Sequence, residues 1–241
     1  MIIILLIKNS LRKIFPSEVW KRLRLFVWSY TNYVSFQSFS GEGEDMILRR
    51  IFYKKKKGFY IDIGAYHPKK SSNTYFFYKK GWRGINIDAM PGSMKLFNRL
   101  RKKDINLEIP LGTKGETVKY YEFADKALNG FESSKLQEKN SSKSQNRLSK
   151  IHQLQSDSLN SILEQYLPEN QKIDFLSIDV EGQEFRILES FDFEKYKPNL
   201  ILTEIWNYSM ESQSNGKVDS LLKQKGYRPI AKTLNTVFYF K

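Results

Sequence analysis

The chain of 241 residues contains no cysteine and two histidines, His67 and His152. The absence of cysteine excludes disulfides and thiolate chemistry, and two histidines are too few for a multi-histidine metal site within one chain. The apolar run at residues 1–7 is too short to span a bilayer. It lacks a basic leader and a small-residue cleavage site, so we expect no signal peptide.

Acidic residues are scarce relative to basic ones, and the formal net charge is +14. Such a charge suits contact with anions, such as nucleic acid, anionic lipid or a phosphorylated substrate. Runs such as residues 54–57 carry much of the excess and are also typical of solvated faces. Hydrophobic residues make up 40% of the chain and aromatic residues 15%, which is enough for one domain with a full core.

The N-terminal segment, residues 8–36, combines basic residues with aromatic and aliphatic ones. One interpretation is an amphipathic segment that lies on an anionic membrane surface. The other is a set of helices that pack on the edge of the main domain. We therefore expect a helical extension over residues 1–37 and a main domain over residues 38–241, in a cytoplasmic protein with peripheral contact at the inner face of the membrane.

Short apolar runs alternate with helical segments through the main domain. This alternation predicts an α/β fold with a mainly parallel sheet, helices on both faces and an antiparallel edge strand. Residues 124–156 are rich in Ser, Lys, Asn and Gln, and we expect a long loop or a polar helical insertion there. The expected strands cover residues 59–63, 84–88, 104–109, 117–123, 174–178, 199–204, 227–231 and 236–240.

Four of these strands end in an acid, namely Asp62, Asp88, Asp179 and Glu204. In open α/β sheets, ligands bind beyond the carboxyl ends of the strands. Gly64 follows the first of these acids and allows the backbone to approach a ligand closely. Asp88 comes about 20 or more residues after this turn, where a carboxylate can accept hydrogen bonds from both ribose hydroxyls.

Two phosphate-binding motifs are missing. The first turn, residues 64–68, reads G-A-Y-H-P rather than G-x-G-x-x-G, and the chain has no G-x-x-x-x-G-K-[ST] segment. Without those glycines, a pyrophosphate has no backbone cradle, so a nucleoside cofactor lacking one is favoured. S-adenosylmethionine fits this pattern, with its methionine part at the turn and its ribose at Asp88.

The order and spacing of several short motifs resemble the FkbM family of S-adenosylmethionine-dependent methyltransferases. The similarity covers roughly residues 38–240 and implies a Rossmann-like class I methyltransferase fold and methyl transfer, usually to a hydroxyl. It also implies that Asp62, Gly64 and Asp88 belong to the cofactor site, with Glu44 near it. The matching segments are residues 43–45, 59–65, 72–74, 81–89 and 178–182, together with the strand that ends at Glu204.

The chain departs from the family pattern at two places. The first turn lacks the later glycines common in methyltransferases, so Tyr66 and His67 must shape the cofactor pocket in their place. Asn160 stands where relatives often have Asp, so a role for that position does not carry over.

Methyl transfer to a hydroxyl usually requires a base to accept its proton. The candidates are Asp179, Glu181 and His67, with Glu204 at the same edge of the sheet. The three acids are also candidate ligands of a hard divalent cation that orients sugar hydroxyls, although no metal site is assigned.

Each candidate has a simpler structural alternative. Asp62 can hold backbone amides of its loop, His67 can shape the turn before Pro68, and Glu204 can pair with Arg186. The segment 206–208, Trp-Asn-Tyr, is the preferred wall of the acceptor pocket, although aromatic residues more often belong to the core or the rim.

We therefore expect an O-methyltransferase that acts on a hydroxyl of a glycan or a glycan precursor. One alternative is a nucleic-acid methyltransferase, which the charge suggests. However, the Lys-rich insertion has few aromatic residues for base stacking, and no N-P-P-[YF] segment is present, so a nucleic-acid partner is disfavoured. The other alternative is a non-catalytic, membrane-associated protein that retains the fold.

Overall fold

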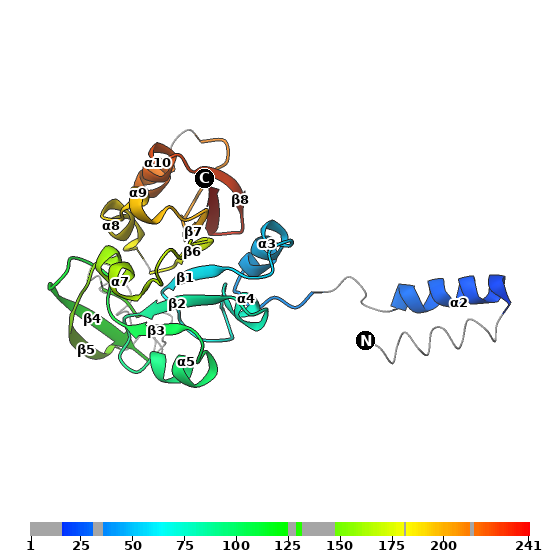
Figure 1. Ribbon diagram of the computed structural model, residues 1–241, viewed down its shortest axis with the longest axis horizontal. Helices are drawn as coiled ribbons and strands as arrows, with labels where there is room; N and C mark the ends of the chain where they lie inside the picture. The colour runs from blue at the N-terminus through cyan, green and yellow to red at the C-terminus, as the bar shows by residue number, and fades with distance from the viewer. Residues whose placement is uncertain (1–15, 31–35, 125–128, 132–147, 181, 213–214) are drawn as a thin grey trace. The chain divides into compact units, whose positions relative to one another are not determined.

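A computed structural model describes residues 16–30, 36–124, 129–131, 148–180, 182–212 and 215–241. The chain divides into two compact units, residues 1–37 and residues 38–241. The first unit contains helix α2, Ser17–Tyr30, in which Lys21 pairs with Glu18 at 2.7 Å (Figure 1). Among the described side chains of this helix, apolar Leu25 is 59% exposed. No helix in the described ranges has both the length and the hydropathy to cross a bilayer.

The second unit is built on a seven-stranded sheet with the strand order β3-β2-β1-β6-β7-β9-β8. The first five strands in this order run parallel, and β9 pairs antiparallel with β7 and β8. This arrangement confirms the predicted fold class, with β9 one place inside the edge that β8 occupies. The strands are β1 Phe59–Ile63, β2 Arg83–Asp88, β3 Ile105–Glu108, β6 Phe175–Ile178, β7 Leu200–Glu204, β8 Arg228–Lys232 and β9 Thr236–Phe240.

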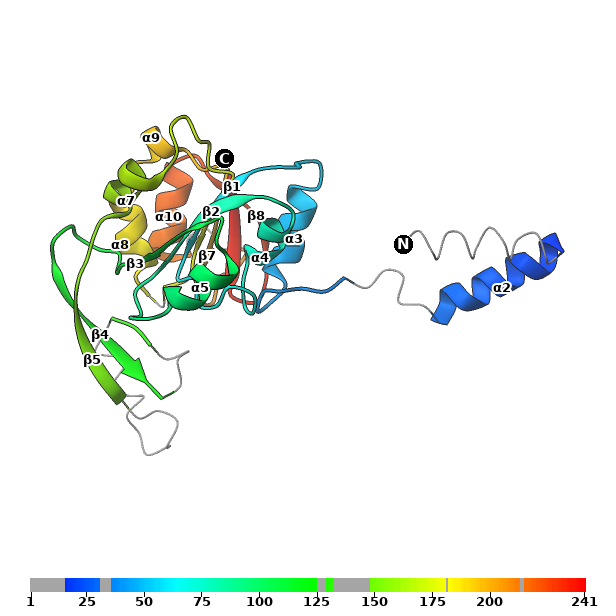
Figure 2. The same cartoon turned by 60° about the horizontal axis from the view of Figure 1, so that its bottom comes forward.

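Helices cover both faces of this sheet, as Figure 2 shows. Helices α3, α4 and α5 lie on one face, and α7, α8 and α10 lie on the other. Every residue of β1 is buried, because a parallel strand between two helical layers has no solvent-facing side. The helices are α3 Glu44–Ile51, α4 Tyr75–Lys79, α5 Met94–Leu100, α7 Leu159–Tyr166, α8 Glu184–Glu189, α9 Phe193–Tyr196 and α10 Gly216–Gln224.

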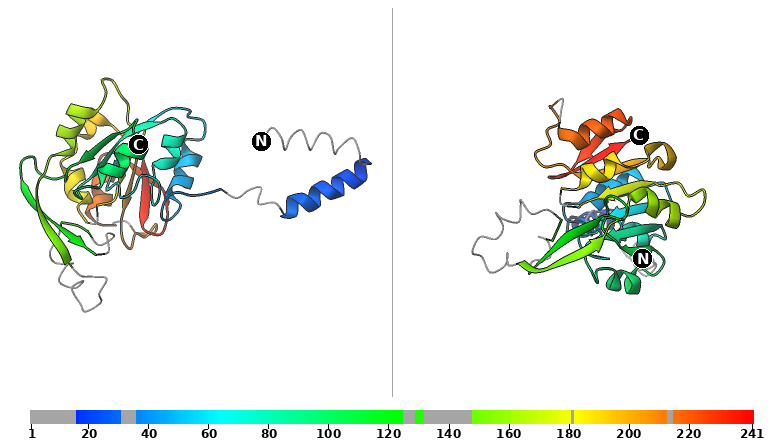
Figure 3. Two further views of the ribbon diagram at one scale, coloured as in Figure 1. Left: turned by 90° about the horizontal axis from the view of Figure 1, so that it is seen from below. Right: turned by 90° about the vertical axis from the view of Figure 1, so that its left-hand side faces the viewer.

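The insertion at residues 124–156 is not a loop or helix throughout, which corrects the expectation. Its last part forms strand β5, Leu148–Gln155, which pairs antiparallel with β4, Thr117–Phe123, in a separate two-stranded sheet. Figure 3 shows this pair extending away from the main sheet. Most side chains of β5 are exposed, so polar residues are tolerated there and the strand lacks the apolar pattern of a buried one. The rest of the insertion, residues 125–128 and 132–147, lies outside the described residues.

A buried cation, Arg101, connects the turn after β1 to the strands and the helix next to it. Its side chain is fully buried, and its Nε donates to Asp104 at 2.8 Å. Its Nη2 donates to the hydroxyl oxygens of Tyr60 at 2.7 Å and Thr74 at 3.1 Å. Its Nη1 donates to the carbonyl oxygen of Pro68 at 3.2 Å. One guanidinium therefore connects β1, the approach to β3, the first turn and the start of α4.

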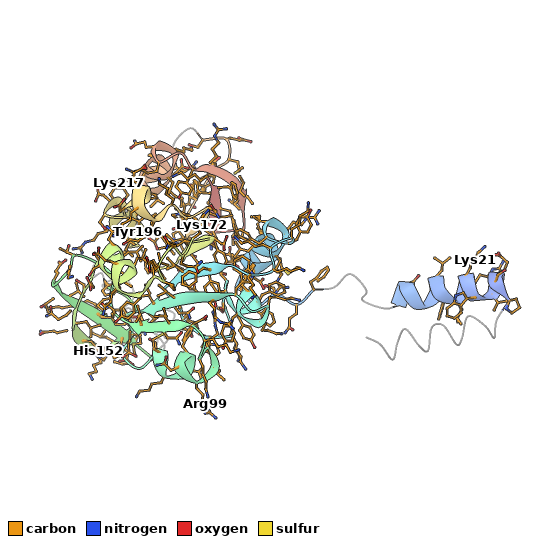
Figure 4. The ribbon with its side chains drawn as sticks, viewed as in Figure 1. Lys21, Arg99, His152, Lys172, Tyr196 and Lys217 are labelled. Carbon is orange, nitrogen blue, oxygen red and sulfur yellow. The ribbon has the colours of Figure 1, made fainter. Side chains whose placement is uncertain are left out.

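Replacing Arg101 with Met should lower the free energy of unfolding by about 3–5 kcal/mol, because Asp104 would remain buried without its cation. Urea denaturation measures this change. Arg99→Met is the matched control, because Arg99 is exposed and points away from the core (Figure 4). Equal loss of stability in the two variants would contradict the role assigned to Arg101.

Candidate functional site

A cavity of about 430 Å³ lies at the carboxyl ends of β1, β2 and β6. This volume falls in the range of small-molecule sites, roughly 300–1,000 Å³. Its walls are mostly apolar, and two acidic residues, Asp88 and Asp179, line it. The position agrees with the rule that open α/β sheets bind ligands beyond their strand ends.

Gly64 lines the cavity and is required by a close approach of two backbones. Its φ is +80°, and a Cβ atom there would lie 1.7 Å from the carbonyl oxygen of Asp179. Its amide donates to the carbonyl oxygen of Ile87 at 2.9 Å. We expected this glycine to admit a ligand. The group that excludes a side chain here is instead the carbonyl oxygen of Asp179, directly after β6.

Asp88 lies at the end of β2 and lines the cavity. Its Oδ1 accepts a hydrogen bond from the amide of Met90 at 2.7 Å, which fixes the carboxylate. Burial raises the pKa of Asp88 to about 6, although the Met90 amide partly opposes the shift. The carboxylate is therefore ionised at neutral pH and can accept hydrogen bonds from ligand hydroxyls.

Asp62 is buried and does not line the cavity. Its Oδ2 accepts a hydrogen bond from the hydroxyl of Thr74 at 2.7 Å, and Thr74 also accepts one from Arg101. Burial raises the pKa of Asp62, while Thr74 and Arg101 oppose the shift. These contacts place Asp62 in the network that supports the first turn, through side chains rather than the backbone amides that the sequence suggested.

Glu44 is buried at the start of α3, outside the cavity lining. Its Oε2 accepts a hydrogen bond from the amide of Glu42 at 2.8 Å, and its Oε1 accepts one from the hydroxyl of Thr236 at 3.4 Å. Glu42 in turn holds the turn between β8 and β9 through Thr233 and Asn235. These bonds fix the segment before α3 against the start of β9.

Tyr66 and His67 follow Gly64 but have different surroundings. Tyr66 lines the cavity and is 53% exposed. His67 does not line it, and its Nδ1 accepts hydrogen bonds from the amides of Lys69 and Lys70, each at 3.0 Å. Partial burial lowers the pKa of His67, and the two lysines add to the shift. These contacts are those of a residue that shapes the turn.

The candidate bases are only partly brought together. Asp179 lines the cavity, and its amide donates to the carbonyl oxygen of Ile63 at 3.0 Å. Glu181 lies outside the described residues, and Glu204 does not line the cavity. Arg186 pairs with Glu116 rather than with Glu204.

The aromatic residues after β7 do not form a wall of this cavity. Trp206 is 60% exposed, Tyr208 is buried, and neither lines it. Within the described part of the chain, no three acidic or histidine side chains are grouped as a metal site requires.

One wall of the cavity, which the sequence did not predict, comes from β4 and from residues 129–131 of the insertion that follows it. Tyr120 of β4 is buried, its ring centroid lies 5.0 Å from that of Phe131, and both residues line the cavity together with Asn129. The Oδ1 atom of Asn129 accepts a hydrogen bond from the amide of Phe123 at 2.8 Å. Burial raises the pKa of the Tyr120 phenol, so it is neutral at physiological pH. The Asn-Gly pair at residues 129–130 is a turn signal in the sequence, and Gly130 forms an antiparallel bridge with Tyr121 of β4.

The donor set fits the cofactor that the sequence suggested. The buried carboxylate of Asp88 suits the two hydroxyls of a ribose, and apolar and aromatic side chains suit a nucleobase. Those walls come from Ile109, Leu111 and Phe131. Each of these groups lines the same cavity as Gly64 and Tyr66.

The chain matches the family model of the methyltransferase FkbM domain over residues 62–229. No curated protein matches the chain.

Solved structures resemble the chain at low identity. The TehB-like SAM-dependent methyltransferase from Corynebacterium glutamicum ATCC 13032 Kitasato is 8% identical, with a TM-score of 0.44 over 93% of this chain and 96% of that chain. The 1,6-didemethyltoxoflavin-N1-methyltransferase from Burkholderia thailandensis, with bound 1,6-didemethyltoxoflavin and S-adenosylhomocysteine, is 11% identical, with a TM-score of 0.41 over 94% of this chain and 90% of that chain. The O-methyltransferase from Bacillus cereus in complex with S-adenosylhomocysteine is 9% identical, with a TM-score of 0.39 over 98% and 97%.

Proposed function

The chain belongs to the FkbM methyltransferase family and is an S-adenosylmethionine-dependent methyltransferase, and from this premise we propose that it methylates a hydroxyl oxygen of a glycan or glycan precursor. The observation that carries the proposal is that Asp88 and Asp179 line the same cavity. One carboxylate is suited to a ribose, and the other lines the same cavity, in which we place the acceptor.

On this proposal, Asp88 accepts hydrogen bonds from the ribose hydroxyls, and the turn at Gly64 and Tyr66 lies beside the methionine part. S-adenosylmethionine supplies a methyl group that its positively charged sulfur makes reactive toward an oxygen nucleophile. Asp62 and Glu44 act indirectly, because each holds a segment next to the cavity rather than lining it.

The acceptor hydroxyl must lose its proton as its oxygen is methylated. Asp179 is our preferred base, because it is the one candidate among the described residues that lines the cavity. Glu181, two residues further along, is the second candidate. His67 is less suited, because its Nδ1 already accepts two backbone hydrogen bonds.

The affinity for S-adenosylmethionine should depend on pH through Asp88. Its carboxylate is protonated below a pKa of about 6 and then accepts fewer hydrogen bonds, so the affinity should fall as the pH drops from 7.5 to 5. Asp88→Ala should weaken binding at pH 7.5 by about tenfold or more, because two hydrogen bonds to a charged group are lost. Isothermal titration calorimetry measures both effects.

Glu108→Gln is the control for the Asp88 variant. Glu108 lies beside Asp88 in the register of β2 and β3 but does not line the cavity, so its loss should leave the affinity close to that of the parent chain. An unchanged affinity in Asp88→Ala would show that Asp88 does not hold the ribose.

The acceptor class can be tested by transfer of labelled methyl from S-adenosylmethionine to separate pools of glycan, lipid-linked glycan and RNA. We expect label in a sugar fraction, recovered as an O-methyl sugar by mass spectrometry after acid hydrolysis. Asp179→Asn should reduce this transfer by roughly 10²–10⁴-fold, while leaving the calorimetric affinity for the cofactor within a few fold. Label confined to RNA would instead support the nucleic-acid alternative.

We also propose that the first unit contacts an anionic membrane surface. Helix α2 has exposed apolar side chains, such as Leu25 and Phe26, next to exposed Lys21 and Arg22. Changing Lys21 and Arg22 to Glu should reduce sedimentation of the full chain with vesicles that contain phosphatidylserine, since each basic residue near such a surface contributes roughly 1 kcal/mol. Equal sedimentation with neutral vesicles would argue against charge-driven contact, and membrane binding without cofactor binding would favour a non-catalytic protein.

A further inference from the structure

A second cavity, which we call the basic groove, lies at the other end of β1 from the site described above. Its volume is about 480 Å³, and the residues between the end of α3 and the start of β1 form one side of it. Half-buried Phe52 and Phe76 provide apolar surface, above the buried rings of Phe77 and Trp82.

The floor of the groove is held in place by packing within the core. The ring of Trp82 lies 4.8 Å from that of Phe77 and 5.4 Å from that of Phe52, measured between centroids. Trp82 and Phe77 are 1% and 2% exposed. These two rings therefore expose little of their faces, and the floor is better suited to a hydrocarbon chain than to a stacked nucleobase.

Four cations line the same groove, and no acidic residue is among the described residues that line it. Two of the cations are held by buried carboxylates, since Arg49 pairs with Asp45 and Lys55 pairs with Asp174. The guanidinium of Arg49 also lies 3.8 Å above the centre of the Phe76 ring.

The other two cations, Lys56 and Lys80, are exposed. Neither belongs to an ion pair found among the described residues. The groove therefore has two positive charges in excess beside an apolar floor. A ligand that complements both features has an anionic head and an apolar tail.

We propose that the basic groove binds an amphiphilic phosphate. Its phosphate or pyrophosphate group would lie between Lys56 and Lys80, which a lysine ammonium suits as a point charge. Its hydrocarbon chain would lie against Phe52 and Phe76. This site is separate from methyl transfer and does not depend on the function proposed for the first cavity.

Calorimetry of the full chain with geranyl diphosphate, in the absence of S-adenosylmethionine, tests the proposal. We expect binding to the parent chain and a loss of affinity of about tenfold for each lysine in Lys56→Gln/Lys80→Gln, because a hydrogen bond to a charged group is lost each time. Both lysines are exposed, so the variant should fold. Its affinity for S-adenosylmethionine should be unchanged, which separates this site from the first one.

Matched controls separate specific binding from general charge attraction. Lys217→Gln/Lys225→Gln removes two exposed lysines, one in α10 (Lys217 in Figure 4) and one at its C-terminal end. Helix α10 lies on the other face of the sheet (Figure 2), so this variant should bind geranyl diphosphate as the parent chain does. Inorganic pyrophosphate and geraniol should each bind at least about tenfold more weakly than geranyl diphosphate, because each lacks one half of the complementary features. No binding, equal loss in the two double variants, or equally tight binding of pyrophosphate or of adenosine diphosphate would overturn the proposal.

Discussion

The buried guanidinium of Arg101 is the interaction on which the cofactor half of this protein depends. It donates to Asp104, to the hydroxyl of Tyr60 in β1 and to Asn86 in β2. It also holds the carbonyl oxygen of Pro68 in the turn that follows β1. A buried cation is costly unless every donor is used, so the elements around it must keep their relative positions. The turn that begins at Gly64 is therefore held in position by Arg101 before any ligand binds. This reduces the free-energy cost of ordering the turn when a ligand binds.

The acids that the sequence predicted for the site divide into two groups. Asp88 and Asp179 line the cavity, where a bound ligand would lie beside them. Asp62 accepts a hydrogen bond from Thr74. Glu44 accepts hydrogen bonds from Thr236 and from the amide of Glu42. Asp62 and Asp88 lie at the ends of neighbouring strands, yet one supports the turn and the other lines the cavity. The neighbours that the fold supplies decide between the two.

Charge is also distributed unevenly over the second unit. The carboxylates of the first cavity lie at one end of β1, and the cations of the basic groove lie at the other. The excess of positive charge, +14 for the whole chain, is therefore not spread evenly over the solvated surface. Part of the positive charge lies in the basic groove, next to aromatic residues that pack on the core. This combination of charge and apolar surface complements an amphiphilic phosphate.

The sequence by itself determined the fold class, and it predicted a site at the carboxyl ends of the strands. Strands β1 and β6 are short, apolar and buried on both faces, so their composition identifies them without knowledge of their partners. The acid at the end of β2 was predicted from spacing alone, and it lines the cavity. Strand β5 was missed because its exposed side chains carry no apolar pattern. The strand that carries Tyr120 was predicted, but its contact with Phe131 and their common place in the cavity wall were not.

Only the tertiary structure decided which acids meet the cavity, since the direction of a side chain at a strand end depends on its hydrogen-bond partners. It also gave a different reason for Gly64, because the approach of the Asp179 carbonyl oxygen is a contact between residues 115 positions apart in the chain. Local sequence specifies backbone preference and burial. Contacts between distant segments, such as those of Arg101 and Gly64, exist only once the chain has folded.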